Sequence, residues 1–118
     1  MATIHIADDD LIVQVHGLDR LWTLKRRLTI PLAHVRGATA DPGIVLEPKG
    51  RRGPGAHVAG VVVAGTFRHD GERVFWDVHH TNKAIVIELQ DDNYRRLIIE
   101  VDEPRVAVAL IEAALTAR

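Results

Sequence analysis

The side chains best suited to binding chemistry lie in the glycine-rich stretch 49–55, KGRRGPG. Glycines let a backbone approach a ligand closely, and arginine guanidinium groups bind phosphate or carboxylate with two parallel hydrogen bonds. Lys49, Arg51 and Arg52 are therefore candidates for contacting an anion or an acidic partner. The stretch has neither GK[ST] nor GxGxxG, so no nucleotide motif is predicted. The alternative is a solvated loop whose charges maintain solubility.

A second basic group, Lys25, Arg26 and Arg27, follows a segment of helical periodicity near 18–24. Cations suit the C-terminal end of such a short helix because they oppose its dipole. The triplet is either a solvated helix end or part of one patch with residues 49–52. No aromatic residue is interleaved with these basic residues, so we expect no nucleic-acid partner.

Seven histidines raise the question of a metal site. If the strands align, three of them converge with a carboxylate in a set that zinc accepts: His57, His69 and His79 with Asp70 or Asp77. Their spacing fits no HExxH motif, and neighbours 79 and 80 would point to opposite faces of a strand. We therefore predict no metal and no cofactor. The alternative is a small metal- or ligand-binding enzyme that uses the histidines near the 69–72 hairpin.

The chain offers few side chains for nucleophilic catalysis, because it contains neither serine nor cysteine. The acidic groups Asp8–Asp10 and Asp91–Asp92 lie in predicted turns, where full solvation leaves carboxyl pKa values near their ordinary range. We predict that the protein is not an enzyme.

Composition predicts one globular domain, 1–118, since 47% of the residues are hydrophobic and 26% are charged. The net charge of -1 gives no overall field that would attract nucleic acid or a membrane. The N-terminus does not resemble a secretory signal, and the longest apolar run, 58–65, is too short to cross a bilayer. A cytoplasmic location is predicted.

Alternating β-branched and apolar residues predict a series of strands. The predicted strands are 3–6, 11–15, 28–30, 34–40, 57–67, 73–78, 84–89 and 97–101, where 34–40 either continues 28–30 or forms a separate strand. An irregular loop is predicted at 41–55. The Asp-Gly pair at 70–71 predicts a tight hairpin, and Pro31 predicts a sheet edge. We expect a mainly β (α+β) fold of about seven antiparallel strands.

The last segment predicts an amphipathic helix that caps the sheets. Asp102 is the expected N-cap, and Pro104 suits the first turn. Apolar residues from Val106 to Leu115 form a wide stripe, which is typical of a packing helix.

Four segments resemble bacterial pleckstrin-homology-like (PH-like) domains: 28–35 (LTIPLAHV), 60–66 (GVVVAGT), 75–78 (FWDV) and 83–104 (KAIVIELQDDNYRRLIIEVDEP). The resemblance implies a strongly bent β-barrel-like sandwich capped by the C-terminal helix. It also implies a scaffold that binds lipid headgroups, peptides or copies of itself. The lipid-binding members carry basic residues on the first hairpin loop, whereas this chain has Asp8–Asp10 there, which repels phosphate.

The resemblance and the absence of a nucleophile together predict a non-enzymatic binding or assembly module. Its partner would be another protein or a second copy, contacted through an exposed sheet edge or the 41–55 loop. A further alternative is peripheral binding to anionic lipid through residues 25–27 and 49–52.

Overall fold

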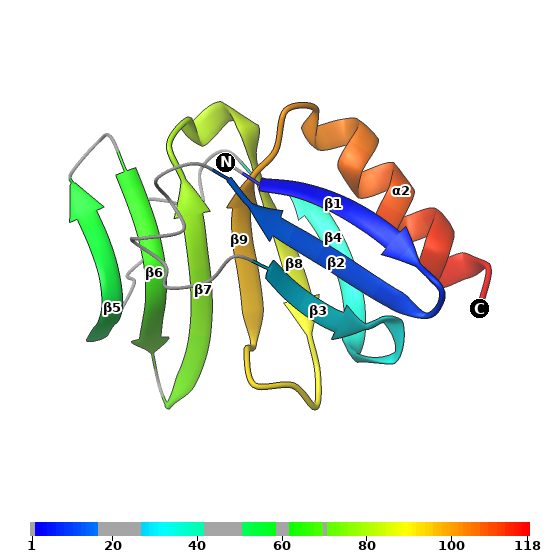
Figure 1. Cartoon of the computed structure of the whole chain (residues 1–118), viewed down its shortest axis with the longest axis horizontal. Coiled ribbons are helices and arrows are strands. Elements are labelled where there is room, and N and C mark those ends of the chain that lie inside the picture. The colour runs from blue at the N-terminus through cyan, green and yellow to red at the C-terminus, as the bar shows by residue number, and fades with distance from the viewer. Residues whose placement is uncertain (1, 17–26, 42–50, 59–61, 70) are drawn as a thin grey trace.

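The computed structural model describes residues 2–16, 27–41, 51–58, 62–69 and 71–118. For 51–58, 62–64, 69 and 81 it describes the backbone alone. In this part of the chain nine strands form two sheets, and one α-helix follows them (Figure 1).

The smaller sheet has the order β1-β2-β3 and is antiparallel: β1 (Ala2–Ala7), β2 (Asp10–Val15) and β3 (Arg27–Pro31). The larger sheet has the order β4-β8-β9-β7-β6-β5: β4 (Val35–Ala40), β8 (Ala84–Leu89), β9 (Arg96–Glu100), β7 (Glu72–Val78), β6 (Val62–His69) and β5 (Arg51–Val58). Two short 3-10 helices connect strands: η1 (Leu32–His34) and η3 (Thr81–Lys83). Helix α2 spans Pro104–Thr116.

The predicted mainly β, α+β class with a C-terminal helix is confirmed. The strand count is higher than predicted, and the sheets are not wholly antiparallel, because β9 inserts between β8 and β7 and runs parallel to β7. Parallel pairing suits a strand that is covered on both faces. Every residue of β9 from Leu97 to Glu100 is buried.

The main core lies between the two sheets. Figure 1 shows the smaller sheet lying across β8 and β9. Alternate residues of β8 and β9, such as Ile85, Ile87 and Leu97, are buried together with Leu11 and Val13 of β2. The period of two that places these residues on one face is the ordinary geometry of a strand.

A second apolar cluster lies on the opposite face of the larger sheet. It contains Trp76 and Val78 of β7, Val86 of β8, Ile98 of β9 and Phe67 of β6. The ring of Trp76 meets Phe67 edge to face, with 6.4 Å between centroids. Trp76 is thus buried in this second cluster, and the apolar runs in β8 and β9 reflect burial on both sides.

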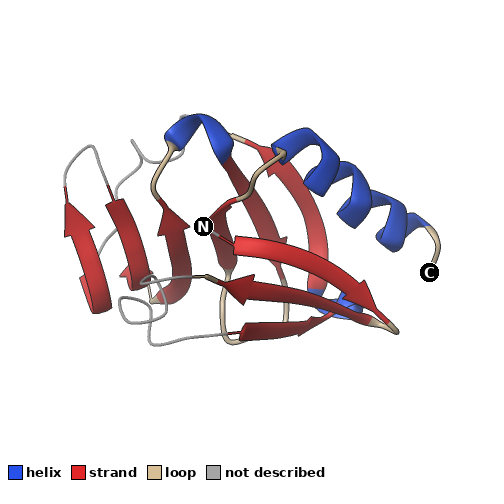
Figure 2. Ribbon diagram, turned by 45° about the horizontal axis from the view of Figure 1, so that its top comes forward, coloured by secondary structure: helices blue, strands red, loops and turns tan. Residues whose placement is uncertain are grey.

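Helix α2 packs mainly along β4, the edge strand of the larger sheet (Figure 2). Ala107 and Ile111 are its buried residues. Glu112 Oε1 accepts a hydrogen bond from the Ala38 backbone N–H at 3.0 Å, so the helix satisfies a donor of the β4 edge. The N-cap position is taken by Glu103 and not by the predicted Asp102, and it makes no side-chain capping bond. No helix in the described ranges is long and apolar enough to span a membrane.

Two further predictions concern irregular segments. The expectation of an unpaired loop through residue 55 was wrong for its last part, because β5 begins at Arg51 and pairs with β6. Its register shifts between Arg52 and Gly55, around Pro54, which has no N–H to donate. Pro31 does end an edge strand, β3, as predicted. The predicted helix near 18–24 lies outside the described residues.

Candidate functional site

Three arginines occupy matching positions on three neighbouring strands of the larger sheet. Arg51 of β5 lies opposite Arg68 of β6, and Arg68 lies opposite Arg73 of β7. Residues directly opposite one another share a face of the sheet, and like charges in such pairs destabilise it. We call Arg51, Arg68 and Arg73 the arginine row.

The tight turn between β6 and β7 fixes this register. Gly71 has φ +79°, a conformation that glycine adopts without strain, and His69 and Glu72 form the pair that closes the hairpin. Arg68 and Arg73 form the next pair, one step from the turn. The two like charges therefore face each other because of the hairpin geometry.

Arg73 is held against an aromatic ring. Its Cζ lies 4.8 Å from the centroid of the Tyr94 ring. Tyr94 is itself buried, its hydroxyl is hydrogen-bonded to Thr66 Oγ1 at 3.2 Å, and its ring meets Phe75 edge to face. The Arg73 backbone carbonyl accepts the Arg95 N–H at 2.7 Å. Backbone and guanidinium of Arg73 are thus both positioned by fixed neighbours.

The Arg73 guanidinium lacks an anionic partner in the part of the chain that the structure describes. Its Nε is buried and makes no hydrogen bond there. The described carboxylates form no ion pair with Arg73 or with Arg68. An unsatisfied buried donor on a charged group costs about 1–3 kcal/mol, so its presence calls for an explanation.

A cavity of about 290 Å³ adjoins these arginines. One wall is the β6–β7 hairpin with Arg68, Gly71 and Arg73, and the other is the turn between β8 and β9, residues 89–95. The volume is at the lower end of the range for small-molecule pockets, about 300–1,000 Å³. A phosphate or carboxylate group with a small substituent fits this space.

Three carboxylates line the cavity: Glu72 and Asp92 are engaged with other groups, and Asp91 is exposed. Glu72 lies 3.3 Å from Arg95 Nε, and Asp92 Oδ2 lies 2.9 Å from His34 Nδ1. Arg95 also donates from Nη1 to the Leu89 carbonyl at 2.8 Å. These contacts tie the β8–β9 turn to the hairpin and to η1 and leave Arg68 and Arg73 as the cations that face the cavity without a carboxylate.

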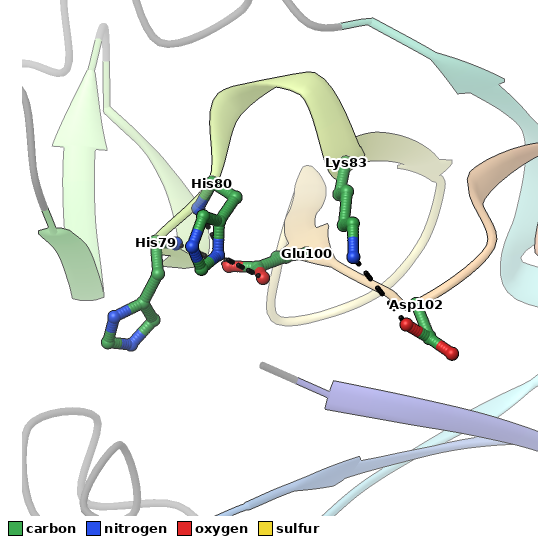
Figure 3. Close-up of polar contacts among 5 residues, drawn as sticks. All are labelled: His79, His80, Lys83, Glu100 and Asp102. Atoms are coloured by element: carbon green, nitrogen blue, oxygen red, sulfur yellow. Dashed lines mark hydrogen bonds and ion pairs between the residues drawn. The ribbon is translucent and has the colours of Figure 1, made fainter.

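The other end of β7 carries a charged cluster of opposite character (Figure 3). Glu100 of β9 is only 1% exposed. Its Oε1 accepts the backbone N–H groups of His79 and His80, at 2.7 and 2.8 Å, and its Oε2 accepts from His80 Nδ1 at 2.8 Å. Burial alone would raise the pKa of Glu100, but the hydrogen bonds from the His80 ring and from both amides outweigh it and lower the pKa.

This second cluster stabilises the turn after β7. Both oxygens of Glu100 have partners, and Lys83 at the end of η3 lies 3.6 Å from Asp102 Oδ1. Figure 3 shows the His79 ring pointing away from His80. Among the described residues no three His, Asp or Glu side chains are grouped to hold a metal. The strand register separates the three histidines whose convergence was considered: His57 lies opposite Val63, at the Val78 end of the β6–β7 pair, whereas His69 lies opposite Glu72 at its other end.

The predicted basic residues are placed as follows. Lys25, Arg26 and Lys49 lie outside the described residues. Arg27 is exposed at the start of β3 in the smaller sheet, whereas Arg51 and Arg52 begin β5 in the larger one. The predicted joining of the two groups stays a prediction, and of these residues only Arg51 falls into register with other arginines.

The sequence reasoning missed Arg68 and Arg73 as site residues. The signal was present, because an Asp-Gly turn at 70–71 pairs 69 with 72 and therefore 68 with 73. The same turn does not reveal Arg51, because Arg51 joins the row through the pairing of β5 with β6 and lies in the predicted 41–55 loop.

Comparison with protein-family models, with curated proteins and with solved structures gives no match to the chain. The resemblance to PH-like domains stays a prediction.

Proposed function

We propose that this chain is a non-enzymatic binding module whose ligand presents an oxyanion, phosphate or carboxylate, to the arginine row. The observation that carries the proposal is the register that places Arg51, Arg68 and Arg73 on adjacent strands. The described residues supply no carboxylate to Arg68 or Arg73. A bound oxyanion would provide the missing countercharge.

The chemistry of arginine supports an oxyanion over other ligands. Each guanidinium offers a planar set of donors that matches two oxygens of a phosphate or carboxylate. Stacking of Arg73 on Tyr94 holds the guanidinium plane in place, so little side-chain entropy is lost when a ligand binds. Repulsion along the row, about 0.2–1 kcal/mol per pair, would be relieved by the same ligand.

Binding without catalysis is favoured by the groups available. The chain contains neither serine nor cysteine. The hydroxyl of Tyr94, which borders the cavity, is occupied by Thr66. Arg68 and Arg73 offer hydrogen-bond donors and positive charge, which bind an anion without activating a nucleophile.

Calorimetric titration with inorganic phosphate, pyrophosphate and acetate tests the proposal. We expect the wild-type protein to bind pyrophosphate more tightly than acetate, since more charge meets the row. Arg73→Gln should weaken pyrophosphate binding about tenfold or more, because a charge-assisted hydrogen bond contributes about 1.5–3 kcal/mol. The matched control is Arg105→Gln on α2, which removes an exposed arginine elsewhere and should leave the affinity unchanged. Equal affinity in the wild type and Arg73→Gln would overturn the proposal.

Sedimentation with vesicles distinguishes a free anion from a lipid headgroup. Phosphatidylcholine vesicles that contain phosphatidylglycerol should pellet the wild type but not Arg73→Gln if the headgroup is the ligand of the arginine row. Pelleting that persists in Arg73→Gln and disappears when Lys25 and Arg26 are replaced by Gln would favour the alternative lipid surface. Binding of pyrophosphate without pelleting identifies a soluble ligand.

A further inference from the structure

Helix α2 exposes an apolar face in addition to the one that it buries. Val106 and Leu110 are 60% and 44% exposed and are the exposed large hydrophobic residues of the described chain. Ala109 and Ala113 are also exposed, and the spacing from 106 to 113 places all four residues on one side of the helix. The predicted wide packing stripe is confirmed for part of its width: Ala107 and Ile111 are buried, and Val108, Ala114 and Leu115 pack partly buried against the core.

Two charged residues border this face on the same side. Arg105 and Glu112 are exposed and are seven residues apart, so they lie two helical turns from each other on one edge of the stripe. At 1.5 Å per residue they are about 10 Å apart, too far to pair within one helix. Glu112 uses Oε1 to accept the Ala38 N–H, which leaves Oε2 for another donor.

We infer that the occupant of this face is the α2 helix of a second copy of the chain, packed antiparallel about a two-fold axis. In that arrangement Arg105 of each copy meets Glu112 of the other, which gives two equivalent ion pairs along one edge of the apolar stripe. In a parallel pair the two-fold axis would run along the helices, so the Arg105–Glu112 edges of the two copies would lie on opposite sides of the interface and form no ion pair. The small side chains of Ala109 and Ala113 allow the two helices to approach closely.

This inference goes beyond the proposed function, because it concerns a different surface and does not depend on anion binding. One helix pair buries less than the roughly 1,200 Å² of a stable interface, so the dimer should be weak and should depend on protein concentration.

Disulfide cross-linking tests the geometry, and the chain has no native cysteine to interfere. The axis lies midway between Arg105 and Glu112, beside Ala109, so Ala109→Cys should give a disulfide-linked dimer under mild oxidation. The matched control is Ala117→Cys at the exposed C-cap of α2, because the two copies of this residue would lie about 25 Å apart along the helix direction. We expect no cross-link there.

Charge reversal supplies a second readout, measured by sedimentation equilibrium. Arg105→Glu alone should weaken dimerisation, and the double variant Arg105→Glu with Glu112→Arg should restore it. Comparable cross-linking of Ala109→Cys and Ala117→Cys would overturn the antiparallel arrangement. A monomer at all concentrations, with no cross-link of Ala109→Cys, would overturn self-association itself.

Discussion

The two ends of strand β7 handle charge in opposite ways. Past its C-terminal end, Glu100 is buried and each of its oxygens accepts hydrogen bonds from His79 or His80. At its N-terminal end, Arg73 lies opposite Arg68, and its buried Nε finds no acceptor in the described residues. Both oxygens of Glu100 have hydrogen-bond donors, whereas the arginine end places like charges opposite each other and leaves Arg73 Nε without an acceptor among the described residues.

The contrast separates structural from binding roles. A buried charge with all partners in place stabilises one local conformation and has little capacity left for a ligand. Like charges held together without a counterion cost stability, and such a cost is typical of a site that is completed by a ligand. This contrast, and not the number of charged residues, is the reason why we propose a binding role for the arginine end of β7.

Removing the hydrogen-bonded carboxylate of Glu100 should cause the largest loss of stability. Glu100→Ala leaves two backbone N–H groups and the His80 ring without their acceptor. We expect the free energy of unfolding to fall by about 3 kcal/mol, measured by urea denaturation. Glu103→Ala, a change of an exposed glutamate that makes no side-chain cap, is the control and should change stability little. A loss equal to that of the control would show that the cluster does not hold the turn.

Acidification should lower the free energy of unfolding through the same residue, Glu100, but by a smaller amount than Glu100→Ala does. A folded-state pKa below the ordinary value of 4.5 means that ionised Glu100 stabilises the folded protein at higher pH. This contribution is present above pH 4.5 and is lost as the pH falls through the lowered pKa. Glu100→Gln cannot titrate, so its stability should decline less than that of the wild type between pH 5 and pH 3 by about the contribution of this one group. Parallel declines would contradict the assignment.

The smallest expected change in stability is a gain, and it comes from replacing Arg68. Arg68→Gln removes one of two like charges that face each other across β6 and β7. Without a ligand, we expect the free energy of unfolding to rise by about 0.5 kcal/mol at low salt, and the gain to shrink as added salt screens the repulsion. The exposed Arg105→Gln should show no such gain. Destabilisation by Arg68→Gln would mean that this arginine has a structural partner.

Much of the fold could be predicted from local sequence patterns. The apolar, β-branched runs at 84–89 and 97–101, the turn at Gly71 and the proline at the start of α2 act over a few residues, so they predicted β8, β9, the β6–β7 hairpin and the helix. The insertion of β9 between β8 and β7 could not be read in this way, because partner choice depends on packing between distant segments. The start of β5 at Arg51 was hidden by Gly53, Pro54 and Gly55, which usually indicate a loop.

The candidate site was predictable only in part. Arg51 was singled out for its residue type, but its relation to Arg68 comes from strand pairing. The stacking of Arg73 on Tyr94 joins residues from a hairpin and a separate turn, a contact that no local pattern encodes. The exposed face of α2 was concealed because its apolar residues look the same in sequence whether they are buried or exposed.

The most direct test is the stabilisation that pyrophosphate confers on four proteins: the wild type, Arg68→Gln, Arg73→Gln and Glu100→Gln. At a concentration ten times the dissociation constant, the wild type should gain about 1.4 kcal/mol in free energy of unfolding. Glu100→Gln should start less stable and still gain the same increment, whereas Arg68→Gln and Arg73→Gln should gain little. Equal gains in all four proteins, or no gain in the wild type, would contradict an oxyanion site at the arginine end of β7.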